Sequence, residues 1–466
     1  MEQPKSIWGS DFRGVTLGII FVVTAVAFEG LAVTTIAPGL SQELHGGHLY
    51  GWVFSAYLLA QLVGTVITGQ WVDRIGPAKP FIVSISVFAI GILIAALAPG
   101  MLVLILGRIL QGYGAGALIN CVYTAITIRF DDSLRPQILA VFSSAYILPG
   151  LVGPYIAGLI AEHLSWRYVF WCILPFIFMS ALLTTPAFRG LRASQGSDPK
   201  KGFLPSLLLA AGTGILITGL GKIPSLYGFI LSLAGLVLLV FPLKKLLPEG
   251  TLLAREGLPA TIASRGLFVA AYFGTQTYLV LALTALTGFS ADTAGFAVAS
   301  AAISWSLAAN LQARLDKKDQ GTGRRKRVLL GLTCMLLGVS ATVPQGFITS
   351  EGFAFINAIV SQIVMGFGIG LAHPTSGAIA FSHVQDGEGG KVSSTLTVAD
   401  TFTPAVGIGI GGAMIAMMET LKLSLGLGIF LALALQALIV VTSLIAATRL
   451  RGRESIVQSA TKAEKW

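Results

Sequence analysis

The sequence has few charged residues and few cysteines. Only 11% of its 466 residues are charged and 54% are hydrophobic, whereas about 25% of residues are charged in an ordinary soluble domain. Over this length such a composition excludes a water-soluble globular fold. The three cysteines, Cys121, Cys172 and Cys334, lie inside apolar runs and lack the spacing of metal ligands. We therefore expect three small buried side chains, no disulfide framework and no metal site.

Motifs of ATP-driven and enzymatic chemistry are also missing. The sequence contains no G-x-x-x-x-G-K-[ST] phosphate loop, so ATP hydrolysis by this chain is not expected. It contains no hydrolase or redox motif either. We predict a protein that is not an enzyme and that needs no cofactor.

Long apolar runs dominate what is present. Each is long enough to cross a bilayer, because about 20 residues at ~1.5 Å per residue span ~30 Å. Pro205 and Pro224 interrupt the pair of runs at 203–243, so a re-entrant hairpin in a twelve-helix chain is the alternative to fourteen helices. The runs fall at about 14–39, 50–71, 80–99, 102–128, 137–161, 166–188, 203–221, 225–243, 264–287, 291–313, 327–348, 352–378, 392–417 and 424–447.

The distribution of basic residues supports this reading. With the N-terminus inside, 27 of the 31 lysines and arginines lie in inner loops and tails, Arg265 included, which leaves Arg108, Arg167, Lys222 and Lys422. This bias is what the positive-inside rule requires, and it predicts that both termini are cytoplasmic. The net charge of +10 is then explained by a basic cytoplasmic face that lies beside anionic lipid. We therefore expect no nucleic-acid partner.

The segment Gly69-Gln-Trp-Val-Asp73-Arg74-Ile-Gly76-Pro-Ala-Lys79 is a charged turn between two apolar runs. It resembles the G-x-x-x-D-R-x-G-[RK]-[RK] loop between helices 2 and 3 of the major facilitator superfamily of transporters, with Pro77 and Ala78 as departures. A weaker copy is formed by Arg314-Leu-Asp316 and Gly323-Arg-Arg-Lys-Arg327-Val. That superfamily is built from two related six-helix halves.

The resemblance implies a role for the Gly69, Asp73, Arg74 and Gly76 turn as a conformational latch. In the family this aspartate meets the cytoplasmic start of a helix in the opposite half, which here would open near Gly390. A helix N-terminus attracts a carboxylate by about 0.3–1 kcal/mol. The latch would close the cytoplasmic side, with Arg74 holding Asp73 or another acid in place.

The fourteen-helix layout resembles that of drug:proton antiporters and related lipid exporters. We therefore expect an all-α membrane protein with the major facilitator fold, in which a helix pair is inserted between two six-helix lobes. The expected divisions are an N-terminal lobe at 1–190, a linker and inserted pair at 191–263, a C-terminal lobe at 264–450 and a cytoplasmic tail at 451–466.

Arg108 lies within the fourth run, in Arg108-Ile-Leu-Gln111-Gly112-Tyr-Gly114-Ala-Gly116. An arginine in hydrocarbon costs about 2.5–3.5 kcal/mol on insertion scales, so it needs a partner or water. The glycines allow another helix to approach closely. The segment resembles the family's R-x-x-Q-G-x-G-x-G motif, to which proton coupling is attributed. The alternative is an arginine that snorkels to lipid headgroups.

The fifth run contains a cluster of glycine and proline, Pro149-Gly150-Leu-Val-Gly153-Pro154-Tyr-Ile-Ala157-Gly158. It resembles the antiporter motif G-x-x-x-G-P-x-x-G-G, with Pro149 and Ala157 as departures. Such a surface is smooth and can kink, which suits packing against the opposite lobe. In the family this motif accompanies export rather than uptake, and simple tight packing is the alternative.

Glu29 lies in the first run, about 22 Å from its cytoplasmic end at 1.5 Å per residue, past the bilayer midplane. No lysine or arginine is near it in sequence. Burial there disfavours the ionised carboxylate, so Glu29 could take up and release a proton near neutral pH. Fourteen-helix drug:proton antiporters often have an acid, usually aspartate, at this place. We predict Glu29 as the proton or cation site, with a neutral structural glutamate as the alternative.

Three further positions are weaker candidates. Asp400, in the thirteenth run, could be a second protonation site or the partner of a basic group in the other lobe. His373, before Pro374, is more typical of a core histidine than of a proton relay. On the outer side, Glu162 and Lys422 could pair as a latch worth about 0–1 kcal/mol.

The expected function is a proton-coupled exporter of amphipathic, cationic, drug-like compounds, driven by the proton gradient and acting as a monomer in the plasma membrane. A lipid exporter of triacylglyceride or glycolipid type is a close alternative. A channel or membrane scaffold is an alternative of another class, but it has little use for buried Glu29 and Arg108. Uptake by the same fold is disfavoured by the 149–158 motif.

Overall fold

A computed structural model of the chain describes residues 6–131, 134–189, 191, 203–348, 350–383 and 389–450. In these ranges every regular element is a helix. The chain divides into two compact units, Met1–Ala211 with Ser290–Ala299, and Gly212–Phe289 with Ser300–Trp466. The expected tail at 451–466 and most of the linker at 192–202 lie outside the described residues.

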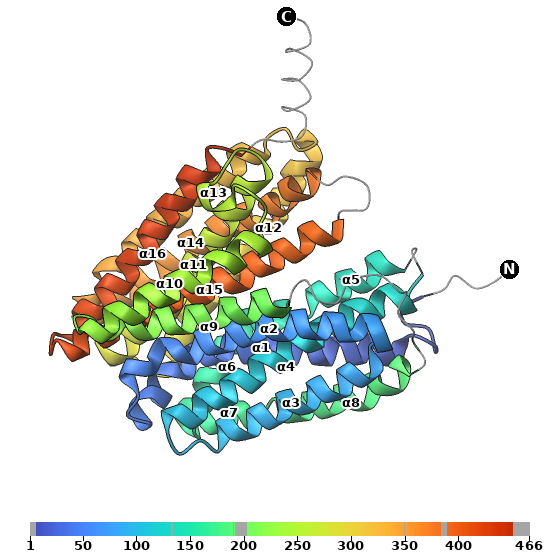
Figure 1. The fold of residues 1–466 in the computed structure, drawn as a ribbon, viewed down its shortest axis with the longest axis horizontal. Coiled ribbons are helices and arrows are strands. Elements are labelled where there is room, and N and C mark those ends of the chain that lie inside the picture. Colours follow the sequence, from blue (N-terminus) through green and yellow to red (C-terminus); the bar gives the residue numbers. More distant parts are fainter. Residues whose placement is uncertain are drawn as a thin grey trace, which may run out of the picture. The chain divides into compact units, whose positions relative to one another are not determined.

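The first unit is built around two sets of packed helices (Figure 1). In one set α4 packs against α2 and α3, and in the other α1 packs against α6 and α8. The helices of this unit are α1 (Arg13–Glu43), α2 (Tyr50–Ile75), α3 (Ala78–Ala96), α4 (Met101–Arg129), α5 (Arg135–Ser144), α6 (Ile147–His163), α7 (Trp166–Trp171) and α8 (Leu174–Phe188). Helix α9 (Phe203–Leu220) begins in this unit and continues in the second.

The second unit is centred on α11, which packs against α14, α15 and α16, while α13 packs against α14. Its helices are α10 (Leu226–Leu246), α11 (Leu258–Ala285), α12 (Ala291–Asp319), α13 (Arg324–Thr342), α14 (Glu351–Ser382), α15 (Gly389–Thr420) and α16 (Leu425–Ala447). The first turns of α12 belong to the first unit. Short 3₁₀ turns, η1 (Gly47–Leu49), η2 (Thr251–Leu253) and η3 (Val343–Gly346), complete the described elements.

The described residues contain 14 helical segments that are long and apolar enough to cross a membrane, which confirms the predicted count. Two of these segments are made of two helices each, α5 with α6 and α7 with α8. The uncertain pair at 203–243 forms two separate helices, α9 and α10, each long enough to span. A single re-entrant hairpin is therefore not what this sequence forms.

Many large apolar side chains are exposed at the protein surface, among them Leu226 and Phe229 on α10. A bilayer can cover them, because lipid tails are as apolar as leucine. The same reasoning corrects the expectation of three buried cysteines. Cys121 is buried, but Cys334 is half-buried and Cys172 is exposed. An apolar run in a membrane protein predicts contact with protein or with lipid, not burial in protein.

Candidate functional site

Glu29 on α1 and Arg108 on α4 form an ion pair in the interior of the first unit. Their side chains are 0% and 1% exposed. A buried guanidinium without a partner would be costly, so the pairing explains how Arg108 is tolerated in a membrane helix. The alternative of an arginine that snorkels to headgroups is wrong.

Three further groups hold the guanidinium of Arg108. Its Nε donates to the carbonyl oxygen of Val53 on α2 at 3.0 Å, and Nη1 donates to Oε1 of Gln111 at 2.8 Å. The ring of Tyr57 lies 4.3 Å from the guanidinium carbon, in cation–π geometry. Among the described residues, Oε2 of Glu29 has no hydrogen-bond partner. Arg108 would thus keep several contacts if Glu29 became neutral.

The glycines after Arg108 bring three helices close together. A side chain on Gly112 or Gly116 would overlap the backbone of α2, and one on Gly114 would overlap Phe88 of α3. Gly112 and Gly116 are four residues apart and so share a helix face, whereas Gly114 lies on another face. This close approach brings Val53 and the Tyr57 ring within reach of Arg108.

Helix α14 contains a second copy of this glycine pattern, which the sequence reading missed. Gly366 and Gly370 face the backbone of α12, and Gly368 faces α13, as their counterparts in α4 face α2 and α3. The residue four positions before Gly366 is Gln362, at the place of Arg108. Gln362 is fully buried, and neither of its amide atoms has a hydrogen-bond partner within the described ranges. The spacing Gly366-x-Gly368-x-Gly370 in the sequence could have predicted this second copy.

Asp400 on α15 forms a bidentate ion pair with Arg265 on α11, through Nε to Oδ1 at 2.8 Å and Nη2 to Oδ2 at 2.7 Å. This corrects two expectations. The basic partner of Asp400 belongs to the same unit, not to the other lobe. Arg265 is not a loop charge, because it lies in the third turn of α11 and is only 7% exposed. His373 also contacts Arg265 and is therefore part of a polar cluster.

Asp73 and Arg74 lie in the last turn of α2, just before the short connection to α3. Asp73 is half-buried and Arg74 is exposed, while Gly69 lies against Asn120 of α4. Gly76 ends α2 with φ of 79°, a conformation that favours glycine. The expected contact of Asp73 near Gly390 joins residues of different units, so the latch stays a prediction.

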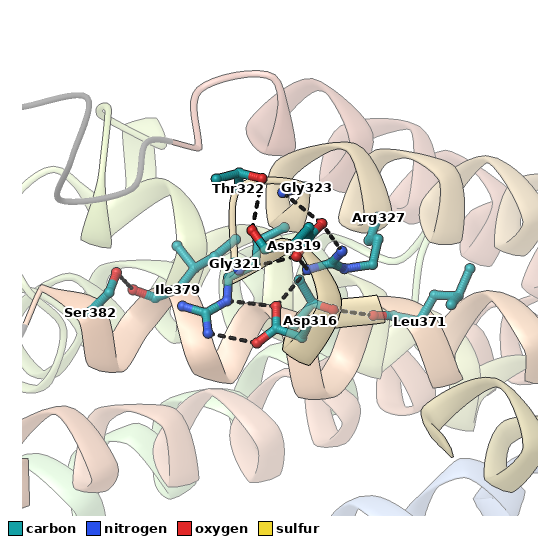
Figure 2. Close-up of polar contacts among 11 residues, drawn as sticks. Asp316, Asp319, Gly321, Thr322, Gly323, Arg327, Leu371, Ile379 and Ser382 are labelled. Atoms are coloured by element: carbon teal, nitrogen blue, oxygen red, sulfur yellow. Dashed lines mark hydrogen bonds and ion pairs between the residues drawn. The ribbon is translucent and has the colours of Figure 1, made fainter. Parts of the chain in front are cut away.

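The corresponding turn of the second unit, between α12 and α13, holds a network of four charged residues (Figure 2). Asp316 accepts from Arg324 at 2.9 and 2.7 Å and also pairs with Arg327. Asp319 pairs with Arg327 at 2.6 Å and accepts from the backbone of Gly321 and Gly323. Both acids therefore face into their own turn.

The 150–158 motif contacts the start of α12 through part of its length. A side chain on Gly158 would overlap the backbone of Asp292, and one on Gly295 would overlap the carbonyl of Pro154. By contrast, a side chain on Gly150 would meet nothing within 4 Å, and one on Gly153 would make an ordinary 3.5 Å contact with Phe28.

Glu162 and Lys422 are both exposed and belong to different units, so their pairing also stays a prediction. A charged contact that the sequence reading missed lies at the end of α1. Glu43 accepts from Nε1 of Trp166 at 2.6 Å and forms an ion pair with Arg167. Arg167 in turn stacks on the Trp166 ring at 4.2 Å.

Within the described ranges, no group of three or more histidine, cysteine or acidic side chains could hold a metal ion. Each unit contains a buried or partly buried polar cluster that is a candidate site of its own. Glu29 and Arg108 form the first, and Arg265, His373 and Asp400 form the second.

Comparison with known proteins agrees with this architecture. A probable multidrug-efflux transporter of Mycobacterium tuberculosis is 22% identical over 92% of this chain and 93% of its own length. The efflux pump aunC of Aspergillus niger is 27% identical over 81% of this chain and 65% of its own length. A POT family peptide transporter, crystallised in an auto-inhibited form, has the same fold, with a TM-score of 0.67 and 16% identity over 93% of this chain and 97% of that one.

The model of one family matches most of the sequence. Residues 17–408 match the Major Facilitator Superfamily, and this range includes the Asp73 turn, the Arg108 helix and both polar clusters. The chain is therefore a multi-pass membrane protein that belongs to the Major Facilitator Superfamily of transporters.

Proposed function

We propose that this protein is a proton-coupled antiporter that exports amphipathic, cationic, drug-like compounds by alternating access. The observation that carries the proposal is the buried ion pair between Glu29 and Arg108. Two relatives that align over 93% of their own length are named probable multidrug-efflux transporters, which supports the export of small molecules.

Glu29 is the proposed site of competition between the proton and the substrate. Its Oε2 is buried and has no hydrogen-bond partner in the described part of the chain, so it can accept a proton or face a cation. Neutral Glu29 no longer attracts Arg108, which remains bound to Val53, Gln111 and the Tyr57 ring. A carboxyl group that holds either a proton or a cation, but not both, couples the two fluxes in opposite directions.

The remaining assignments are part of the same proposal. Both termini face the cytoplasm, and the protein is a monomer of the plasma membrane that needs no cofactor. The lobes at 1–190 and 264–450 flank the inserted pair at 191–263. The turn with Gly69, Asp73, Arg74 and Gly76 controls closure of the cytoplasmic side, and the motif with Gly150, Gly153, Pro154 and Gly158 adapts the fold to export.

Reconstitution into liposomes with an acidic lumen tests the proposal. A permanently charged quaternary ammonium dye is added outside, because such a dye does not accumulate by simple pH partition. The wild type should accumulate the dye until an ionophore collapses the gradient. Glu29→Gln should abolish the accumulation, and Glu29→Asp, which keeps the carboxylate, should restore part of it.

Protein-free liposomes give the background for this assay. Gradient-driven accumulation that persists in a folded Glu29→Gln variant would refute the role of Glu29. No dye movement by folded wild type would refute the proposed substrate class and favour a lipid substrate, which extraction of the donor medium would detect.

A further inference from the structure

The polar cluster of the second unit uses every N–H group of one arginine. Nε and Nη2 of Arg265 donate to the two carboxylate oxygens of Asp400. Nη1 donates to the carbonyl oxygen of His373 at 2.9 Å and to Oγ of Ser376 at 3.2 Å. The second hydrogen of Nη2 points at Nε2 of His373, at 2.7 Å. All five donors of the guanidinium are thus occupied.

These contacts determine which group can carry a proton. Asp400 is held as an anion by a bidentate pair with a group that does not deprotonate, so it is a poor proton acceptor. An arginine N–H can only donate, so Nε2 of His373 must accept and therefore carries no proton. His373 is accordingly neutral, with its proton on Nδ1. Within this cluster, the lone pair on Nε2 of His373 is therefore the position where a proton can bind.

The environment of His373 allows a proton to reach it. The side chains of His373 and Asp400 are 29% and 28% exposed, whereas that of Arg265 is 8% exposed. The imidazole lies edge-on to Trp305 of α12, with ring centroids 5.5 Å apart, and to Phe268 of α11 at 6.4 Å. The ring of Tyr272 packs edge-on against Trp305, with ring centroids 5.1 Å apart.

The other charged groups near this level are already engaged. From α11 and α15, the charged groups that face His373 are Arg265 and Asp400. Helix α13 approaches α14 through Gly331, which lies against Gly368 and Ala372. One turn earlier on α13, Arg327 is bound to the acids of the α12–α13 turn. Among the charged groups of the described residues, Arg265 and Asp400 are therefore the ones in contact with His373.

We propose that His373 is a proton-binding residue of the second unit and that its protonation rearranges the Arg265–Asp400 pair. The proton binds Nε2 and gives an imidazolium, so the bond donated by Nη2 of Arg265 is lost. Oδ2 of Asp400, 3.7 Å from Nε2, is an acceptor for the new N–H group. The new His373–Asp400 pair competes with Nη2 of Arg265 for this oxygen, while Nη1 still holds the backbone of α14.

This inference rests on the proposed proton coupling for its role in transport, but the protonation itself does not. It assigns a second proton site, separate from Glu29, in which the histidine takes up the proton and Asp400 stays charged. When His373 changes from neutral to a charge of +1, one of the hydrogen bonds between α11 and α14 is lost. Imidazole is the side chain whose protonation ordinarily changes between about pH 5 and 8.

The protonation is tested by nuclear magnetic resonance on full-length protein labelled with ¹⁵N-histidine in lipid nanodiscs. His373 is assigned by comparison with His373→Gln among the 5 histidines of the chain. At high pH, His373 should be a neutral imidazole with the proton on Nδ1, and lowering the pH should convert it to imidazolium. A proton on Nε2 at high pH, or no conversion between pH 5 and 8, would overturn the proposal.

The role in transport is tested with the liposome assay over the same pH range. His373→Gln should change the pH profile of dye accumulation. Ser376→Ala removes one Arg265 contact but no titratable group. In the resonance experiment this variant should shift the titration of His373 without eliminating it. A wild-type pH profile in folded His373→Gln would exclude a role in coupling. If wild type moves no dye, the antiport proposal fails, but the resonance experiment still decides the protonation.

Discussion

Glu29 and Arg108, on α1 and α4, are paired in the interior of the first unit with side chains 0% and 1% exposed. The two partners differ in what happens when the other is removed. A lone carboxyl group can take up a proton and become neutral, but a lone guanidinium stays charged. The pair is therefore energetically asymmetric.

This asymmetry predicts unequal costs for the two single substitutions. Glu29→Gln leaves a buried charge on Arg108, which keeps its contacts with Val53, Gln111 and the Tyr57 ring, so the free energy of unfolding should fall by about 1–3 kcal/mol. Arg108→Gln should cost less, because Glu29 can become protonated. The double variant should cost less than the sum of the singles. Thermal unfolding in detergent, followed by tryptophan fluorescence, measures these effects, and additive costs would contradict direct coupling.

The 150–158 motif predicts opposite effects for two of its glycines. Gly158→Ala should lower stability by about 1–3 kcal/mol, because the new methyl group overlaps the backbone of Asp292. Gly150→Ala should be neutral or should stabilise the helix by up to about 1 kcal/mol, because its methyl group meets no atom within 4 Å. The same unfolding measurement separates them, and equal effects would show that α6 does not approach α12 through Gly158.

The contact between Glu43 and Trp166 predicts a stabilising hydrogen bond at the end of α1. Trp166→Phe keeps the aromatic ring but removes the donor to Glu43, and it should cost about 1 kcal/mol because the carboxylate is half exposed. Trp171→Phe, on the same short helix, removes an exposed indole and serves as the control. A melting temperature that falls no further for Trp166→Phe than for Trp171→Phe would exclude this bond.

The turn between α2 and α3 predicts control of the resting conformation by Asp73. Asp73→Asn removes the charge of the proposed latch, so the cytoplasmic side should open more often and the resting state should shift inward. Labelling of single cysteines placed on that side should become faster. Asp11→Asn, an exposed acid near the start of α1, is the matched control. Labelling rates equal to those of wild type would count against the latch.

Several features could be predicted because they depend on local sequence. A run of about 20 apolar residues spans a membrane whatever its neighbours are, so the fourteen helices follow from the sequence. A charge inside such a run needs a partner, so Glu29, Arg108 and Asp400 were recognisable as special positions. The Asp73 turn was recognisable from its residues at fixed spacing.

Which partners meet depends on helix rotation, depth and packing, and only the tertiary structure decided this. Glu29 and Arg108 were both identified, but nothing local in the sequence pairs α1 with α4. Arg265 was assigned to a loop because it stands at the edge of an apolar run, whereas α11 begins seven residues earlier, at Leu258. That extension places Arg265 beside Asp400 and His373. Sequence determines which residues a membrane must accommodate, whereas packing determines which of them neutralise one another, because the Glu29–Arg108 and Arg265–Asp400 pairs each join helices that are distant in the chain.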